Sequence, residues 1–197
     1  MGRSLICEWT RWPSAAAKRR ITIRRPTADF AEERGAPAFE LGRKIAGVRV
    51  GIRHDGTWRS WQYVARVWAE LLRRDGAIPV LLQTGERTGP EGERTRADLE
   101  AWHGEIDCAV SGLGTCGSCT MWSVRDAIGV EAKGKPVAAA ICEEFVGHAR
   151  TTASFLGHPE LKVLVLPYPL ETLSEAELQP IAEEYYPKFL ALLGAER

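Results

Sequence analysis

Short apolar runs alternate with longer amphipathic stretches over residues 44–197. The runs are rich in β-branched residues and carry almost no charge, which is typical of strands buried on both faces of a parallel sheet. Strands are predicted at residues 46–52, 78–83, 107–112, 136–142 and 163–167.

The stretches between these runs predict helices. Residues 58–76 place Trp61, Val64, Trp68 and Leu71 at helical spacing and stop at a glycine. Further helices are predicted at 95–105, from about 117 to Lys133-Gly134, at 144–157, and at 174–194 with a break near Pro180 or Pro187; residues 85–94 are predicted to be a polar loop. This alternation predicts an α/β fold, a three-layer sandwich around a mostly parallel five-stranded sheet, Rossmann- or flavodoxin-like.

Residues 1–43 show no sustained periodicity and are predicted to be an irregular N-terminal arm, followed by a single domain at 44–197. Residues 1–20 are expected to be disordered or to come from a mis-assigned start. Residues 1–25 hold seven basic side chains, Arg3, Arg11, Lys18, Arg19, Arg20, Arg24 and Arg25, against one acid, Glu8. No aromatic interleaving accompanies them, so we interpret the arm as a solvated tail, not a nucleic-acid contact.

Composition narrows the class of protein. The net charge of the 197 residues is zero, which predicts no nucleic-acid partner, and no window is apolar enough to cross a membrane. The basic N-terminus lacks the apolar run of a secretory signal. The cysteine count is odd, at five, which favours reduced thiols in a cytoplasmic protein over a secreted disulfide framework.

Chemically active residues follow the predicted strands at their carboxyl ends, where α/β sheets place their sites. This edge would gather Arg53, His54, Asp55, the stretch 112–119, Cys142, Glu143, Glu144 and Tyr168. Three thiols and three acids at one edge indicate a functional site.

The stretch "GLGTCGSCT" (112–120) fits two motifs. Gly112, Gly114 and Gly117 have the G-x-G-x-x-G spacing of a dinucleotide-binding turn, with Glu143 near the position of a ribose-binding acid. That fingerprint normally follows the first strand of a domain, and here it follows the third. Tight strand-to-helix turns also need glycine for backbone reasons alone. We therefore rank a nucleotide-binding module below the thiol hypothesis.

The second motif is C-x-x-C. A helix that begins at Gly117 or Ser118 places Cys116 at its N-cap, where free backbone N–H groups and the helix dipole stabilise a thiolate. Cys119 follows one turn later, with an expected Cα separation of about 5–6 Å that allows a disulfide.

A helical projection from residue 117 predicts which side of this helix is buried. One arc holds Met121, Val124, Ala127, Ile128, Glu131 and Ala132, which we expect to be the core stripe. The opposite arc holds Cys119, Trp122, Ser123 and Asp126. On this projection Asp126 is expected on a solvated face, and Trp122 either lies over the thiols or packs against the N-terminal arm or a partner chain.

Zinc is a third alternative, with Cys116, Cys119, Cys142 and His54 as ligands. Structural zinc sites usually show two closely spaced ligand pairs, and this chain has one. No metal and no other cofactor is predicted.

The segment "GTCGSCTMWSVRDA", with the later "LPYPLETLSEAEL", resembles the UGSC family of selenoproteins and their cysteine-containing relatives. The resemblance covers about residues 21–180 and places Cys116 at the family's selenocysteine position, followed by matching Gly117, Ser118, Cys119 and Thr120. It implies a nucleophilic or redox-active sulfur at Cys116. Tyr168 stands where the family commonly has histidine between two prolines, which puts an acid–base role at that position in doubt.

Together these observations predict a thiol-dependent enzyme of redox or thiolate-nucleophile type that acts on a small molecule. Cys116 is the attacking thiol, Cys119 resolves it, and Asp126 is a catalytic candidate. Residues expected to contact substrate or support the thiols are Asp55, Gly114, Gly117, Ser118, Thr120, Trp122, Glu143 and Tyr168. A non-enzymatic alternative is a subunit that binds a partner, or a second copy of itself, through exposed Trp58 and Trp122.

Overall fold

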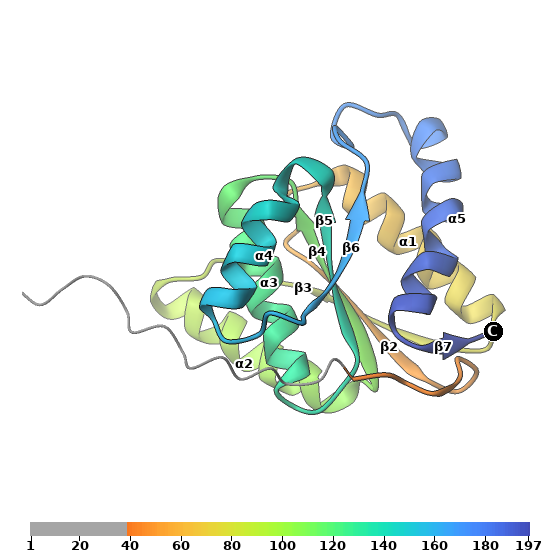
Figure 1. The fold of residues 1–197 in the computed structure, drawn as a ribbon, viewed down its shortest axis with the longest axis horizontal. Helices are drawn as coiled ribbons and strands as arrows, with labels where there is room; N and C mark the ends of the chain where they lie inside the picture. The colour runs from red at the N-terminus through yellow and green to blue at the C-terminus, as the bar shows by residue number, and fades with distance from the viewer. Residues whose placement is uncertain (1–38) are drawn as a thin grey trace, which may run out of the picture.

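Five strands form one parallel sheet in a computed structural model that describes residues 39–197 (Figure 1). They are β2 (Arg49–His54), β3 (Ile78–Gln83), β4 (Cys108–Gly114), β5 (Val137–Cys142) and β6 (Lys162–Leu166), in the order β3-β2-β4-β5-β6. Every pair of neighbours is parallel. All five predicted strands are confirmed, with ends shifted by a few residues.

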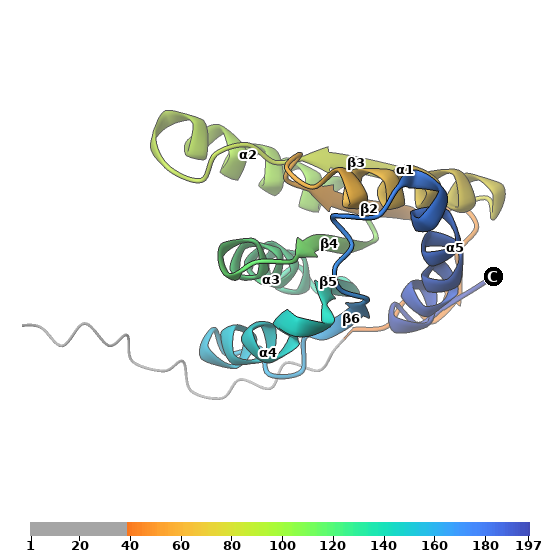
Figure 2. The same ribbon diagram turned by 90° about the horizontal axis from the view of Figure 1, so that it is seen from above.

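Helices cover both faces of the sheet (Figure 2). Helices α1 (Arg59–Arg74) and α5 (Glu175–Leu192) lie on one face. The other face carries α2 (Gly89–Glu105), α3 (Gly117–Glu131) and α4 (Val146–Phe155), which follows a short 3₁₀ turn, η1 (Glu143–Phe145). The predicted three-layer α/β sandwich is therefore confirmed. Within residues 39–197, no helix has the length and apolar character needed to cross a membrane.

The core lies between these layers. Every residue of β4 and β5 is buried, as expected for central strands covered on both faces. On the face that carries α1 and α5, the predicted stripe of α1 is confirmed for Trp61, Val64 and Trp68, which are all buried. Trp68 stacks on Phe189 of α5 with ring centroids 4.9 Å apart and donates its Nε1–H to the Ala182 carbonyl at 2.8 Å. These contacts join the two helices of this layer.

Helix α2 begins earlier than predicted. Residues 89–94 belong to its first turns, although the sequence indicated a polar loop there. Pro90 suits the first turn of a helix because its missing N–H needs no partner at that position, and Glu91 is favoured by the helix dipole. The charged residues of this segment are simply the solvated face of the helix.

The predicted break in α5 is wrong. The helix runs continuously through Pro180 and Pro187, and at its start Glu177 Oε2 accepts the Ser174 N–H at 2.8 Å and the Ser174 hydroxyl at 2.6 Å. Each interior proline costs about 3 kcal/mol by removing a backbone hydrogen bond. The buried side of α5, which includes Tyr186 and Phe189, packs against the core and offsets that cost.

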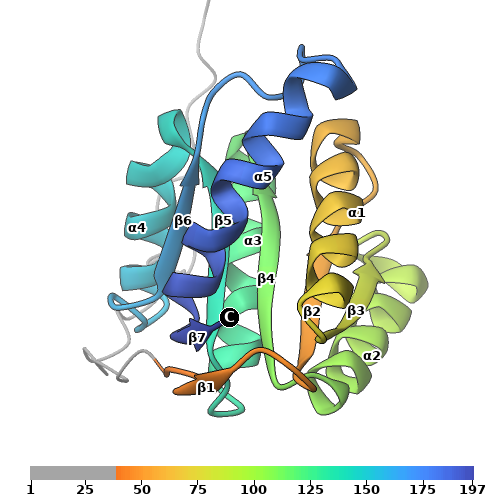
Figure 3. The ribbon, with the colours of Figure 1, turned by 90° about the vertical axis from the view of Figure 1, so that its right-hand side faces the viewer.

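Two short strands join the described ends of the chain. β1 (Arg43–Lys44) pairs in parallel with β7 (Ala195–Glu196), and the Leu41 N–H donates to the Leu193 carbonyl at 2.8 Å (Figure 3). The last residues of the predicted N-terminal arm are thus part of the folded domain. Residues 1–38 of that arm lie outside the described residues.

The strand order fixes where a site can form. In chain order the sheet strands are arranged 2-1-3-4-5, so the connections leave β2 and β4 in opposite directions. Open α/β sheets bind ligands in the crevice at the carboxyl ends of such a strand pair. Here those ends carry Arg53 and His54 on β2, and the turn after Gly114 on β4.

Candidate active site

Cys116 is the N-cap residue of α3, as the sequence predicted. Its Sγ accepts the Cys119 N–H at 3.2 Å, and the two cysteines form a disulfide with their Cα atoms 5.3 Å apart. This separation is within the range that a disulfide can bridge. The Cys116 sulfur therefore occupies the position where free N–H groups and the helix dipole stabilise a negative charge.

Polar groups surround the two sulfurs. The Ser118 hydroxyl lies 3.6 Å from Cys116 Sγ, and the Trp58 indole Nε1–H donates to Cys119 Sγ at 3.4 Å. Thr120 is buried, and its Oγ1 stabilises the turn by donating a hydrogen bond to the Cys116 carbonyl at 2.7 Å. Each sulfur thus has a donor beside it, which favours the thiolate form of a reduced pair.

The glycines of the turn have steric explanations inside the domain. A Cβ at Gly112 would lie 2.6 Å from the Trp61 ring. A Cβ at Gly114 would lie 2.9 Å from Thr120 Oγ1 and would collide with Ile141. Gly117 has open space around it. Packing thus accounts for two of the three glycines of the dinucleotide-like spacing.

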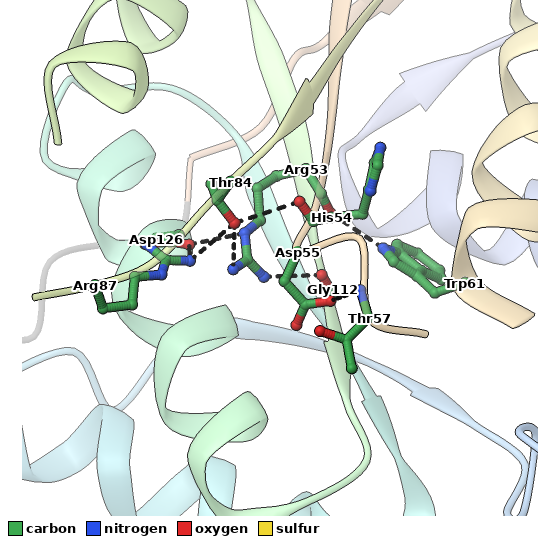
Figure 4. Close-up of polar contacts among 9 residues, drawn as sticks. All are labelled: Arg53, His54, Asp55, Thr57, Trp61, Thr84, Arg87, Gly112 and Asp126. Atoms are coloured by element: carbon green, nitrogen blue, oxygen red, sulfur yellow. Dashed lines mark hydrogen bonds and ion pairs between the residues drawn. The ribbon is translucent and has the colours of Figure 1, made fainter. Parts of the chain in front are cut away.

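A largely buried charge cluster of Arg53, Asp126 and Arg87 lies at the carboxyl end of β2 (Figure 4). Arg53 Nε is 2.8 Å from Asp126 Oδ2, and Arg87 contacts the two oxygens of the same carboxylate at 3.1 and 2.7 Å. Arg53 also donates to the Gly112 carbonyl and to Thr84 Oγ1, each at 2.9 Å. Burial lowers the pKa of Arg53, and the neighbouring Asp126 charge opposes that effect. The cluster ties β2, the β3–α2 loop and α3 together.

The predicted solvated position of Asp126 is wrong. Asp126 and Ser123 are both buried, although the projection placed them opposite the core stripe. The reason is tertiary: α3 lies between α2 and α4 and against β4 and β5, so more than one side of it is covered (Figure 2). Of the predicted stripe, Val124, Ala127 and Glu131 are buried, Met121 and Ile128 are partly buried, and Ala132 is exposed.

A pocket of about 300 Å³ opens beside the disulfide. Three segments line it: the end of β2 with its loop, the β3–α2 connection, and the start of α3. Its lining residues are Arg53, Asp55, Thr57, Gln83, Thr84, Gly85, Glu86, Arg87, Glu91, Ser118, Cys119 and Trp122. The structure therefore brings together four of the predicted site residues, Asp55, Ser118, Cys119 and Trp122.

The two tryptophans proposed as an exposed partner surface are each partly buried in the site. Trp58 contacts Cys119, as described above, and the Trp122 ring lies 4.9 Å from the Arg87 guanidinium and 5.7 Å from that of Arg125. Both rings pack onto polar groups of the site and stay partly accessible, so binding of a partner through them remains a prediction.

Glu143 and Tyr168 lie apart from the pocket, at the ends of β5 and β6. The Tyr168 N–H donates to Glu143 Oε1 at 3.3 Å, and its ring packs edge-on against Phe145. Neither residue lines the pocket beside Cys119. The structure thus pairs these two predicted residues with each other and not with the thiols.

The remaining described cysteines are buried free thiols. Burial raises the pKa of Cys108 to about 12 and that of Cys142 to about 11. Among residues 39–197, no group of three or more His, Cys, Asp or Glu side chains has an arrangement that could hold a metal ion. The four candidate zinc ligands do not form such a group.

Arg87, Thr84 and Glu171 were not among the residues predicted from the sequence. Arg87 and Thr84 follow β3 at the carboxyl edge, and their position after a predicted strand was the available signal. Glu171 follows β6, and its Oε2 accepts a hydrogen bond from Ser60 Oγ at 2.9 Å. Burial, together with the nearby Asp55 charge, raises the pKa of Glu171, while the Ser60 hydrogen bond partly opposes this.

Comparisons with solved structures show distant likenesses of the fold. A mutant flavo-di-iron protein from Thermotoga maritima aligns with a TM-score of 0.41 and 12% identity, over 74% of this chain and 37% of that one. A protein from Ralstonia solanacearum described as a D-3-phosphoglycerate dehydrogenase aligns with a TM-score of 0.38 and 17% identity, over 84% of this chain and 51% of that one. This chain thus spans only part of either protein.

A search of curated proteins finds no match. The UGSC family model matches residues 22–195, a range that includes the five-stranded sheet, helices α1 to α5 and the C-x-x-C turn of the described residues. This match covers most of the chain and extends beyond the segment in which the sequence motifs were recognised. The protein belongs to the UGSC family.

Proposed function

We propose that this protein is a thiol-dependent enzyme that reduces a small molecule through the Cys116/Cys119 pair. One observation carries the proposal: Cys116 caps α3, and its Sγ both accepts the Cys119 N–H and is within bonding reach of Cys119 Sγ. A helix N-terminus makes a thiolate available near neutral pH, and a second thiol one turn away can resolve the bond that it forms.

The reduced pair supplies two electrons to a substrate with a weak bond X–Y, such as a disulfide or a peroxide. The Cys116 thiolate attacks X, forms a Cys116–X bond and releases Y as its anion, which takes up a proton. Cys119, as its thiolate, then attacks Cys116 Sγ and releases X, which is protonated in turn. The protein is left as the Cys116–Cys119 disulfide, and an external thiol of low molecular weight returns it to the dithiol.

The pocket beside Cys119 gives this substrate a place to bind. Its walls combine the Trp122 ring, the Arg87 and Arg53 guanidinium groups, and the Asp55 carboxylate. A volume of about 300 Å³ is at the lower end of the range for small-molecule sites. The pocket therefore suits a small polar molecule better than a protein segment.

Trapping of a mixed disulfide tests the proposal. Reduced wild type, Cys116→Ser, Cys119→Ser and the matched control Cys108→Ala are each exposed to a small aromatic disulfide, and their intact masses are measured. Cys119→Ser should accumulate one adduct on Cys116, because its resolving thiol is missing. Wild type and Cys108→Ala should instead become two protons lighter without an adduct, and a thiol reductant should reverse this change.

Turnover is measured on the same four proteins with dithiothreitol as the electron donor. Both active-site variants should fall to the uncatalysed rate, and Cys108→Ala should retain wild-type turnover. Full turnover in Cys116→Ser, or an adduct on Cys119 in that variant with none on Cys116 in Cys119→Ser, would contradict the assigned roles.

A further inference from the structure

A second pocket, of about 320 Å³, lies between α3 and α4. Met121 and Arg125 line it from α3, one turn apart. His148, Thr151, Thr152 and Phe155 line it from α4 at the spacing of one helix face, and Leu156, which directly follows α4, lines it too. None of these residues lines the pocket beside Cys119, so the two pockets are separate.

The walls of this pocket, called the groove from here on, combine apolar and basic side chains. Met121, Phe155 and Leu156 supply the apolar surface, and the lining contains no aspartate or glutamate. Arg125 is exposed, and among residues 39–197 its charge has no carboxylate partner; its guanidinium lies 5.7 Å from the Trp122 ring. The Thr152 hydroxyl likewise makes no side-chain hydrogen bond to the described residues. The groove therefore offers an apolar wall, a free hydroxyl and an uncompensated positive charge.

We propose that this groove binds a small molecule with an apolar body and a single carboxylate. The carboxylate would accept hydrogen bonds from the Arg125 guanidinium and the Thr152 hydroxyl, because guanidinium groups bind carboxylates with two parallel bonds. The apolar body would cover Met121, Phe155 and Leu156. No cysteine lines the groove, so binding does not depend on the proposed thiol chemistry.

The groove also lies next to the C-x-x-C turn. His148 lines it, and His148 Nε2 donates to the Gly117 carbonyl at 3.0 Å. Gly117 directly follows Cys116 and begins α3. A ligand in the groove would thus sit beside the residue that holds the first turn of the helix in place.

Calorimetric titration with 4-phenylbutyrate and its uncharged amide tests the proposal. The proteins are wild type, Arg125→Gln, Met121→Gln and the matched control Arg96→Gln, which changes an exposed arginine on α2 that lies outside the groove. Wild type should bind the acid about tenfold more tightly than the amide, because a charge-assisted hydrogen bond contributes more than a neutral one. Arg125→Gln should reduce the affinity for the acid to that for the amide.

Met121→Gln should lower the affinity for both ligands equally, since it removes apolar contact without changing the charge. Arg96→Gln should leave both affinities unchanged. Amide chemical shifts of Arg125 and Thr152 should move on addition of the acid in wild type. Equal affinity of wild type for acid and amide, an unchanged affinity in Arg125→Gln, or no binding at millimolar ligand would each overturn the proposal. So would shifts confined to residues outside α3 and α4.

Discussion

Arg53 and Asp126 form an ion pair at 2.8 Å with both side chains buried, and Arg53 also lines the pocket of the candidate active site. Arg87 contacts the same carboxylate, so one anion serves two guanidinium groups. The three residues come from the end of β2, the middle of α3 and the β3–α2 connection. The contacts among these three residues thereby fix the relative positions of the three segments that line the pocket beside Cys119.

Replacing Asp126 by asparagine should destabilise the protein strongly. The substitution leaves two guanidinium groups without their anion, and breaking a buried pair in this way costs about 3–5 kcal/mol. Urea unfolding measures the change in free energy. Asp98→Asn, an exposed aspartate on α2 with no ion pair among the described residues, is the control and should change stability by less than about 0.5 kcal/mol. Equal effects of the two substitutions would mean that the cluster does not stabilise the fold.

The two glycines nearest the thiols should differ in their tolerance of alanine. A Cβ at Gly114 meets Thr120 Cα at 3.1 Å and must displace the first turn of α3, whereas a Cβ at Gly117 meets nothing within 4 Å. Gly114→Ala should therefore cost about 1–3 kcal/mol in unfolding free energy, and Gly117→Ala less than about 0.5 kcal/mol. Thermal unfolding of the two variants beside wild type compares them. A Gly117→Ala variant that is less stable than Gly114→Ala would be inconsistent with this packing.

Alkylation of the reduced protein should discriminate among the described cysteines. Near neutral pH, iodoacetamide should label Cys116 first, because its thiolate is stabilised at the start of α3. Cys108 and Cys142 should stay unlabelled in the folded protein, since burial raises their pKa values to about 12 and about 11. Their thiolates appear only as the pH approaches those values. Peptide mapping by mass spectrometry measures the order in which the cysteines are labelled. Labelling of all four described cysteines at one rate would refute the predicted order.

Glu171 should make stability depend on pH. Burial raises its pKa in the folded protein above the ordinary glutamate value of about 4.3. Between the unfolded and folded pKa values, the folded state binds more protons than the unfolded state. The contribution of Glu171 to the unfolding free energy should therefore fall as the pH rises through that window.

Urea unfolding of wild type and Glu171→Gln across that range isolates this contribution, because glutamine keeps an acceptor for Ser60 but does not titrate. The unfolding free energy of Glu171→Gln relative to that of wild type should increase with rising pH and then level off. Glu144→Gln, at an exposed position, is the control and should show no such trend. A pH-independent difference for Glu171→Gln would contradict the assigned burial.

The sequence by itself determined the alternation of strands and helices and the place of Cys116 at the start of α3. These features are local: apolar runs, helical spacing and a glycine-rich turn act over a few residues, so their pattern survives in the sequence. The same locality explains why the break in α5 was wrongly predicted. Proline propensity is local, but the packing of Tyr186 and Phe189 that overrides it is not.

Only the tertiary structure decided the environment of the thiols. Helical periodicity assigns a single buried side, and it could not foresee that α3 is enclosed by its neighbours, so Asp126 was placed in solvent. Its partner Arg53 is distant in sequence, and nothing in the spacing of either residue connects them. Charge pairing, the pocket walls and the packing of Trp58 against Cys119 depend on which segments the sheet order brings together. Long-range contacts of this kind leave no periodic signal in a single sequence.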